Sequence, residues 1–512
     1  MPCQVLADIH HHGFEDYAMH SCNTISLLVL SVLFVSGQQT AAQDSPQLGN
    51  GSRNGWADQT SIVVWTRTTK NAEMAADGPD FKKVPANLEG EIRRSGNDER
   101  YLNEQLADGA NLDQMLGACP GAPGEVRISY YPAGQPDKIV HQEWKKTIAD
   151  SDFTAQWKLE GLQPDSKYLT VIEARTVGSE STSATLKGGF ETAPAVDEPA
   201  DVKFCLTTCH DFLRRDDGTI GHKIYPSMTA LDPDFTIHAG DIEYYDKPQP
   251  YAWTKELMRF KWARIFSMPR NREYYSTHTT YFIKDDHDTL KNDTWPGQVY
   301  GNVSFDEGVQ LFNKEQFPTR DPRYATVSWG KDLQIWILEG RDYRSANTMP
   351  DGPEKSILGT QQKNWLKQTL KDSRATFKLV FSPTPIVGPD RTNKKDNLAN
   401  EVFSHEGDEL RNFFATIDGI VLFCGDRHWQ YASVDAETGL WEFGCGPGSE
   451  THELGWKPGD VRPVHRFLRV AGGFLSGEVD HSSGDPRLTI RHHDVNGTKL
   501  SEFRFPVAAS NN

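Results

Sequence analysis

From residue 202 to the end of the chain, short apolar runs with strand-like composition alternate with segments of helical spacing. The runs 202–208 and 332–340 are typical of strands, whereas 250–268 and 359–373 have the apolar spacing of amphipathic helices. This alternation predicts an α/β sheet that is covered on both faces. Because such sheets bind ligands at the carboxyl ends of their strands, the residues that follow each strand are the first place to look for a site.

The preceding segment, 50–195, has a different pattern. Several short strands of alternating polarity are separated by turn residues, which predicts an all-β sandwich domain. Its stretch LEGLQPDSKY resembles a corner of a fibronectin-type-III domain. Residues 70–124 look partly helical and are interpreted as an insertion between strands, and the acidic, Pro-rich stretch 193–201 as a linker. We therefore expect a sandwich at 50–195 followed by an α/β domain at 200–512.

The N-terminus contains an apolar run, Ile25 to Val35, followed by small residues up to Ala42. The run is too short to span a bilayer, so it predicts a signal peptide in residues 1–42 rather than a transmembrane anchor. Cleavage is expected near Ala42, and the protein is expected to be secreted or periplasmic. No Lys or Arg precedes Arg53, so the usual basic start of a signal is missing. Met19 is a plausible true start, and a buried apolar helix is the alternative reading of the run.

Charge and cysteine content narrow the function. The formal net charge is -17 and no Lys/Arg-rich run occurs, which argues against nucleic-acid binding through phosphate contacts. The acidity indicates either a solvated surface or carboxylates that gather around cations. Of 7 cysteines, the two in the leader are Cys3 and Cys22. The remainder is odd, so at least one thiol stays unpaired, either as a metal ligand or as a buried inert group.

Four of the predicted strands end in side chains that can bind metal ions. A carboxylate or a histidine after one strand is usually structural, but four such corners in one α/β domain predict a common metal site. The side chains with suitable donor atoms are Cys209, Asp241, Tyr244, Asp286, Asn292, Asp426 and His428.

The donor types predict ions of different kinds. Cys209 and Tyr244 would be anionic ligands, which favours trivalent iron or another highly charged ion at one position. Asp286, Asn292 and Asp426 offer oxygen atoms, which suit Ca²⁺, Mg²⁺ or Mn²⁺. A centre with both sets would hold at least two ions.

A two-metal centre that cleaves phosphate esters also needs a bridge and a proton donor. Two ions about 3.5–4 Å apart can clamp a phosphoryl group and supply a hydroxide for in-line attack, and Asp241 is the predicted bridge between them. His428 is expected to bind one ion through an imidazole nitrogen. His287, flanked by carboxylates, is the predicted general acid for the leaving group. Arg427 is interpreted either as a bidentate phosphate ligand or as a structural salt-bridge partner.

At this point the sequence resembles the alkaline phosphatase D (PhoD-like) branch of the metallophosphoesterases. The motifs TTCHDF (207–212), HAGDIEYY (238–245), IKDDHDTLKND (283–293) and VLFCGDRHW (421–429) carry the resemblance, with further matches at 337–345 and 358–366. The resemblance implies a four-layer α/β sandwich, Fe³⁺ held by Cys209, Asp241, Tyr244 and His428, and Ca²⁺ held by Asp241, Asp286 or Asn292, and Asp426. Mn, Mg and Zn are the alternative divalent metals.

The sequence departs from the family at Lys284, where tryptophan is usual, and at Glu339-Gly340-Arg341, where LDTR is usual. The prediction is a metal-dependent hydrolase of small or polymeric phosphate esters, either monoesters or diesters. Two alternatives stay open. One is a related dinuclear centre acting on a sulfoester or a phospholipid, which Lys284 and Arg427 motivate. The other is a binding protein whose catalytic domain has decayed.

Overall fold

The structure is a computed structural model that describes residues 45–506. The predicted signal peptide lies outside the described residues. Within the described part of the chain, no helix is both long enough and apolar enough to cross a membrane.

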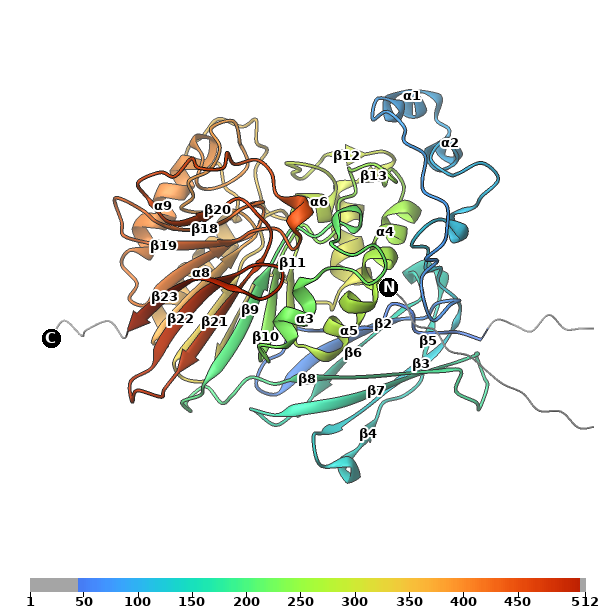
Figure 1. The fold of residues 1–512 in the computed structure, drawn as a ribbon, viewed down its shortest axis with the longest axis horizontal. Helices are drawn as coiled ribbons and strands as arrows, with labels where there is room; N and C mark the ends of the chain where they lie inside the picture. Colours follow the sequence, from blue (N-terminus) through green and yellow to red (C-terminus); the bar gives the residue numbers. More distant parts are fainter. Residues whose placement is uncertain (1–44, 507–512) are drawn as a thin grey trace, which may run out of the picture. The chain divides into compact units, whose positions relative to one another are not determined.

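Two large sheets form the centre of the C-terminal part (Figure 1). The six-stranded sheet has the order β11 (Thr280–Ile283), β10 (Phe235–Ala239), β9 (Val202–Thr207), β21 (Phe474–Asp480), β22 (Arg487–His493), β23 (Lys499–Pro506). The seven-stranded sheet has the order β14 (Ala325–Trp329), β15 (Leu333–Ile337), β16 (Phe377–Ser382), β17 (Ile420–Cys424), β19 (Trp441–Cys445), β18 (Gln430–Val434), β20 (His465–Arg469). A separate hairpin pairs β12 (Val299–Tyr300) with β13 (Val303–Ser304).

Each central sheet has a parallel core with antiparallel strands added to it. Strands β9, β10 and β11 are parallel, as are β15, β16, β17 and β19. The inner faces of the two sheets share one apolar core, in which Phe204 of β9 lies 5.8 Å from Phe381 of β16 and 5.9 Å from Phe423 of β17, ring centre to ring centre. The neighbouring strand residues Val380 and Leu422 point the other way, into a second core. Both faces of these strands are buried, which explains their continuous apolar composition.

Helices cover the outer faces of both sheets. Helices α3 (Ile224–Thr229), α4 (Lys255–Ser267) and α5 (Pro269–Thr277) pack on the six-stranded sheet, and α8 (Gly359–Asp372) and α9 (Ser404–Phe414) pack on the seven-stranded sheet. The short helices α6 (Asp286–Thr289) and α7 (Phe305–Gln310) follow β11. The layers thus run helix, sheet, sheet, helix, and the prediction of a mixed α/β fold is confirmed.

The N-terminal part consists of two smaller sheets. One contains β1 (Ser52–Gly55), β2 (Ser61–Arg67) and β6 (Thr154–Glu160); the other contains β3 (Gly124–Pro132), β4 (Val140–His141), β5 (Lys145–Thr147), β7 (Lys167–Arg175) and β8 (Ala184–Glu191). Both bury side chains in a common core. The hydroxyl oxygen of Tyr168 accepts a hydrogen bond from the Gln163 amide at 2.9 Å, an arrangement similar to a tyrosine corner. The fibronectin-III likeness of this part stays a prediction.

The segment predicted as an insertion packs against the α/β part. It includes α1 (Leu88–Ser95) and α2 (Asp98–Asn103), which lie near α4 and β12 in Figure 1. Tyr101 contacts Trp253 with ring centres 5.8 Å apart, and the Gln105 side chain donates a hydrogen bond to the Tyr251 carbonyl at 3.0 Å. The insertion therefore packs against the loop at 246–253 and supports its position.

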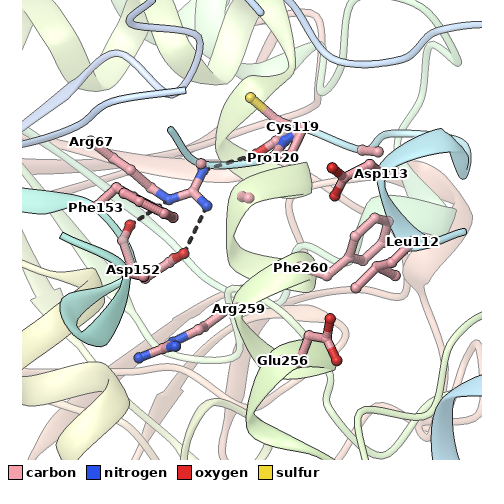
Figure 2. A pocket seen from close by; sticks show the side chains of 14 residues that line it. Arg67, Leu112, Asp113, Cys119, Pro120, Asp152, Phe153, Glu256, Arg259 and Phe260 are labelled. Atoms are coloured by element: carbon pink, nitrogen blue, oxygen red, sulfur yellow. Dashed lines mark hydrogen bonds and ion pairs between the residues drawn. The ribbon is translucent and has the colours of Figure 1, made fainter. Parts of the chain in front are cut away.

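A cavity of about 300 Å³ lies where the insertion, the sandwich and α4 meet (Figure 2). Its wall contains an ion pair between Arg67 and Asp152, with Arg67 Nη2 2.8 Å from Asp152 Oδ1. Arg67 Nη1 also donates a hydrogen bond to the Cys119 carbonyl at 2.9 Å. The Arg67 guanidinium thus joins the sandwich to the insertion.

Candidate metal centre

The polar corners predicted from the sequence lie at the carboxyl ends of four strands. Cys209 follows β9, Asp241 follows β10, Asp286 follows β11 and Asp426 follows β17. The first three strands are adjacent and parallel in one sheet, and β17 belongs to the facing sheet. The two sheets therefore bring these side chains to one edge of their shared core.

Three of these residues have a backbone conformation that is unusual for a side-chain-bearing residue. The φ angles of Cys209, Asp241 and Asp426 are 51°, 56° and 60°. Left-handed conformations at non-glycine residues cost on the order of 1–3 kcal/mol each and gather at functional sites.

The two Gly-Asp corners need glycine because other backbone approaches closely. A Cβ on Gly240, whose φ is +96°, would lie 2.7 Å from Cβ of Asp285. A Cβ on Gly425 would lie 2.2 Å from the carbonyl oxygen of Ala239, the last residue of β10. The glycines allow β10, β11 and β17 to converge, so the Gly-Asp pattern follows from strand packing as well as from chemistry.

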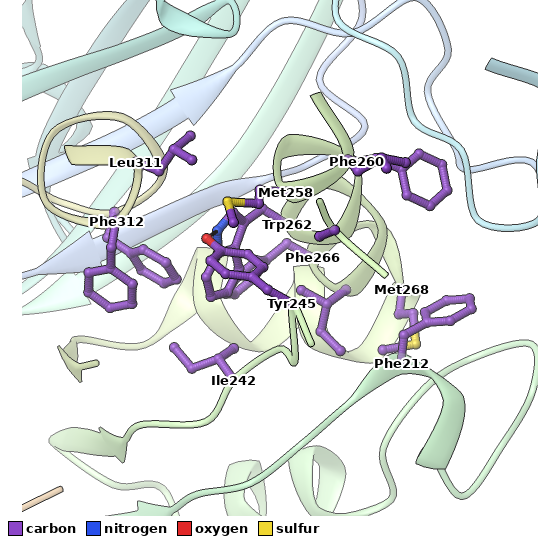
Figure 3. Packing of buried hydrophobic residues seen from close by; sticks show 14 of the residues in the cluster. Phe212, Ile242, Tyr245, Met258, Phe260, Trp262, Phe266, Met268, Leu311 and Phe312 are labelled. Atoms are coloured by element: carbon purple, nitrogen blue, oxygen red, sulfur yellow. Dashed lines mark hydrogen bonds between the residues drawn. The ribbon is translucent and has the colours of Figure 1, made fainter. Parts of the chain in front are cut away.

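The loop after β10 is anchored from both sides. Ile242 and Tyr245 point into the aromatic cluster beneath α4 (Figure 3). On the other side, the Asp288 carboxylate accepts hydrogen bonds from the amides of Asp241 at 2.6 Å and Ile242 at 2.8 Å. This anchoring fixes Asp241 and Tyr244 relative to the neighbouring strands.

One half of the centre, here called the thiolate half, consists of Cys209, Asp241, Tyr244 and His428. Cys209 Sγ lies 3.7 Å from Asp241 Oδ2, and the Tyr244 hydroxyl lies 3.2 Å from the same oxygen. The Tyr244 hydroxyl is also 3.2 Å from His428 Nε2. The four predicted iron ligands thus direct their donor atoms to one point.

The other half, here called the carboxylate half, consists of Asp286, Asn292 and Asp426. Donor atoms of Asp286 and of Asp426 each lie within 4.8 Å of Asp241 in groups that are close enough to hold an ion. Asn292 lines the same cavity as Asp241 and Asp426. Asp241 belongs to three of the four such groups among the described residues, which is the position expected of a bridging ligand.

The donor atoms fit a bound cation. Asp241 Oδ1 and His428 Nδ1 are buried and have no hydrogen-bond partner among the described residues. Burial, together with the negative charges of Asp286 and Asp285, raises the pKa of Asp241 well above its usual value. Burial likewise raises the pKa of Tyr244 and lowers the pKa of His428. A cation would complete these contacts and offset the repulsion between the carboxylates.

His287 lies in the wall of the same cavity and is held by an acidic partner. Its Nδ1 is 2.5 Å from Asp246 Oδ1, and Asp246 Oδ2 accepts a hydrogen bond from the Asn292 amide at 3.0 Å. Burial lowers the pKa of His287, but the carboxylates of Asp246 and Asp286 outweigh it and raise the pKa overall. Asp246 was not predicted from the sequence. Its carboxylate orients both His287, the predicted general acid, and the backbone at Asn292, a predicted metal ligand.

Arg427 is buried and faces away from the cavity. Its Nη1 donates a hydrogen bond to Asp390 Oδ1 at 2.9 Å, and its Nη2 pairs with the Asp426 carboxylate. Arg427 was interpreted either as a phosphate ligand or as a structural salt-bridge partner. These contacts favour the salt bridge, with Asp426 as one of its partners.

The charged residues that depart from the family motifs form ion pairs in the protein interior. Lys284 Nζ pairs with Glu339 and lies 2.7 Å from Asp342 Oδ1. Arg341 Nε lies 2.5 Å from Asp285 Oδ1. These substitutions form an interior ion-pair network, and none of the five residues lines the cavity.

The cavity at the centre has a volume of about 310 Å³ and is called the metal cavity below. Sequence reasoning missed several of its lining residues, because they sit in loops without a motif; they are Arg214, Lys247, Arg391, Lys394 and His452. The His452 ring lies against Tyr244 and His428, with ring centres 5.1 Å and 4.3 Å apart. Its Nδ1 is 2.9 Å from the His210 carbonyl oxygen.

Comparison with known proteins shows which family part of this chain is similar to. Residues 304–459, which include Asp426 and His428, match the family model described as PhoD-like phosphatase. This stretch of the chain is similar to PhoD-like phosphatases. The predicted resemblance is confirmed, and the chain is a phosphoric ester hydrolase that depends on metal. A comparison with curated proteins finds no match.

Two solved structures support the fold of the PhoD-like chain. A structure of PhoD has a TM-score of 0.66 and 16% sequence identity and covers 90% of this chain and 90% of its own. The purple acid phosphatase PPD1 from yellow lupin (Lupinus luteus) seeds has a TM-score of 0.57 and 12% identity, and the match covers 89% of this chain and 74% of that one. At these identities the likeness speaks for the fold alone.

Proposed function

We propose that this chain is a secreted phosphoesterase that hydrolyses phosphomonoesters, phosphodiesters or both at a centre of two or more metal ions. The observation that carries the proposal is the convergence of the thiolate half and the carboxylate half on one cavity, with Asp241 common to both. The strained backbone at Cys209, Asp241 and Asp426 adds support, since such strain is retained where function needs it.

The donor set suggests which ions bind. In the thiolate half, Cys209, Asp241, Tyr244 and His428 would hold Fe³⁺; in the carboxylate half, Asp241, Asp286, Asn292 and Asp426 would hold Ca²⁺ or another divalent ion such as Mn²⁺, Mg²⁺ or Zn²⁺. Such ions polarise a phosphoryl oxygen and lower the pKa of the attacking water.

The chain's own residues supply position and a proton. The Asp246 carboxylate fixes the His287 ring through Nδ1, which leaves Nε2 as the nitrogen that can donate a proton to the leaving oxygen. Arg427 holds the Asp426 carboxylate in place from outside the cavity, so its proposed role is positioning rather than phosphate binding.

The alternative of a different ester rested on Lys284 and Arg427. Both are buried and neither lines the metal cavity, which speaks against a role of either side chain in substrate choice. The alternative of a decayed binding protein would require lost ligands, and the complete donor set speaks against it.

The test is hydrolysis of p-nitrophenyl phosphate and bis(p-nitrophenyl) phosphate by protein supplied with Fe and Ca, with and without chelator. We expect turnover of at least one ester, lost with chelator and restored by metal. Absence of turnover with both esters in the metal-loaded protein would refute the proposal. Export would be checked by N-terminal sequencing of protein recovered outside the cytoplasm, with a mature terminus expected near Gln43.

A further inference from the structure

A second cavity adjoins the metal cavity and is here called the outer cavity. It has a volume of about 490 Å³ and shares Arg391 and Asn393 with the metal cavity as lining residues. The lining also continues along the chain, because Leu454 faces the metal cavity and Gly455 faces the outer cavity. A molecule bound at the metals can therefore extend into the outer cavity past Arg391.

Among the charged residues that line the outer cavity, cations outnumber anions. Arg391, Lys457 and Arg462 line it, against a single carboxylate from Asp460. Arg462 is paired with that carboxylate at 3.5 Å, and its guanidinium also lies over the Trp456 ring at 4.4 Å. Lys457 forms no ion pair with any residue between 45 and 506. This concentration of positive charge contrasts with the chain's net charge of -17.

Arg391, on the shared wall, has one carboxylate partner among the described residues, Asp390, and no hydrogen-bond acceptor for its buried Nε. The nearest carboxylate oxygen, Asp390 Oδ1, is 3.5 Å away and already accepts a hydrogen bond from Arg427. Burial lowers the pKa of Arg391, consistent with a cation that lacks full compensation. Such a group is expected where an anionic ligand completes the contacts.

Gly455 leaves room for this arginine. A Cβ at Gly455, whose φ is +92°, would lie 2.5 Å from Nη1 of Arg391. The guanidinium therefore packs directly against a backbone that only glycine allows at this distance. A side chain at position 455 would therefore compete with the Arg391 guanidinium for this space.

We propose that the outer cavity binds a second anionic group of the substrate, a phosphate or a carboxylate, beyond the scissile ester. Arg391 and Lys457 contact that group, and the preferred substrates are esters whose leaving group carries its own negative charge. The inference rests on the proposed phosphoesterase function and specifies its substrate class. Cationic clefts of this kind also raise the local concentration of anions around an acidic protein.

The test compares two esters that differ only in the far anion: butane-1,4-diol monophosphate and butane-1,4-diol bisphosphate. Phosphate release by the metal-loaded enzyme gives kcat/KM for each. The bisphosphate has a statistical advantage of about two, and a charge-assisted contact to the far phosphate should raise the ratio to about ten- to hundredfold. Hydrolysis of both esters with a ratio of about two would overturn this inference and leave the phosphoesterase function standing. No hydrolysis of either would overturn both.

Variants assign the effect to the outer cavity. Arg391→Gln and Lys457→Gln should each lower the bisphosphate to monophosphate ratio, by about tenfold for Arg391. Gly455→Ala should also lower the ratio, because it displaces the guanidinium without changing charge. Lys395→Gln, an exposed lysine that lines neither cavity, is the matched control and should keep the wild-type ratio. An equal fall in the ratio in Lys395→Gln would show that only general charge matters and would overturn the proposed contact.

Discussion

The two halves of the metal centre share Asp241 but differ in how the protein treats their charge. In the thiolate half, burial is the largest effect on Cys209, Tyr244 and His428, and it shifts each pKa towards the neutral form. In the carboxylate half, burial raises the pKa of Asp286, but His287 and Arg341 outweigh it and hold the pKa well below its usual value.

This difference indicates what each half requires of its ion. In the thiolate half, Cys209 and Tyr244 must give up protons when they bind, which favours a highly charged, tightly held ion. Asp286 in the carboxylate half is already compensated by protein cations, so its ion competes with them and is expected to exchange more readily. The comparison suggests a permanent ion on one side and an exchangeable one on the other.

The largest effect is expected from removing Asp241, the ligand that the two halves share. Asp241→Asn should lose metal from both halves and lower kcat/KM by about 10³-fold or more, since both charge stabilisation and water activation disappear. Metal content by mass spectrometry and phosphate release measure the two effects. Full retention of both metals would exclude Asp241 as the bridge.

A matched variant separates ligand loss from unfolding. Without metal, Asp241→Asn should melt above metal-free wild type, because it removes a buried negative charge beside Asp286. Asp288→Asn should instead melt at a lower temperature. It should lose about 1–3 kcal/mol of unfolding free energy, because the Asp288 carboxylate accepts several backbone hydrogen bonds. Calorimetry of both metal-free variants gives the comparison, and a lower melting temperature for Asp241→Asn would contradict the repulsion argument.

Single changes in each half should remove one kind of ion. Cys209→Ser is expected to lower the iron content while divalent metal is retained. Asp426→Asn is expected to lower the divalent metal content while iron is retained. Turnover should fall in both, since both ions act on the same phosphoryl group. Elemental analysis after dialysis against chelator measures the loss. Equal loss of both metals in each variant would mean that the halves do not bind independently.

The general acid should matter only when the leaving group needs a proton. His287→Ala is expected to slow alkyl phosphates by about 10²-fold or more but p-nitrophenyl phosphate much less. Asp246→Asn, which weakens the orientation of the ring, should show the same trend with a smaller size. The dependence of kcat on leaving-group pKa measures both. A uniform loss across leaving groups would exclude the proton-donor role.

The smallest effect should come from the buried arginine. Arg427→Gln is expected to weaken divalent metal binding by about 10- to 100-fold, because Asp426 loses the partner that orients it. KM measured at saturating metal should change little. A large rise in KM under that condition would instead support direct contact with phosphate.

Local chemistry predicted the fold class and most of the donor set. The alternation of apolar runs and helical segments indicated the α/β sheet. The corners after four strands marked Cys209, Asp241, Asp286 and Asp426. Both signals are local, because a strand's carboxyl end is recognisable from a few residues. The loop residues Arg391 and His452 carried no such pattern and could not be found this way.

The sequence by itself determined which donor atoms were available and roughly where each strand delivered them. Only the tertiary structure decided their use. Asp285, Asp286 and Asp288 are near neighbours in the chain, yet one pairs with Arg341, one faces the centre and one accepts hydrogen bonds from the loop after β10. Arg427 likewise turned inward because Asp390 lies behind it. Burial in a common core makes each polar group take the partner that lies nearest in space, and that partner is set by strand packing, not by distance along the chain.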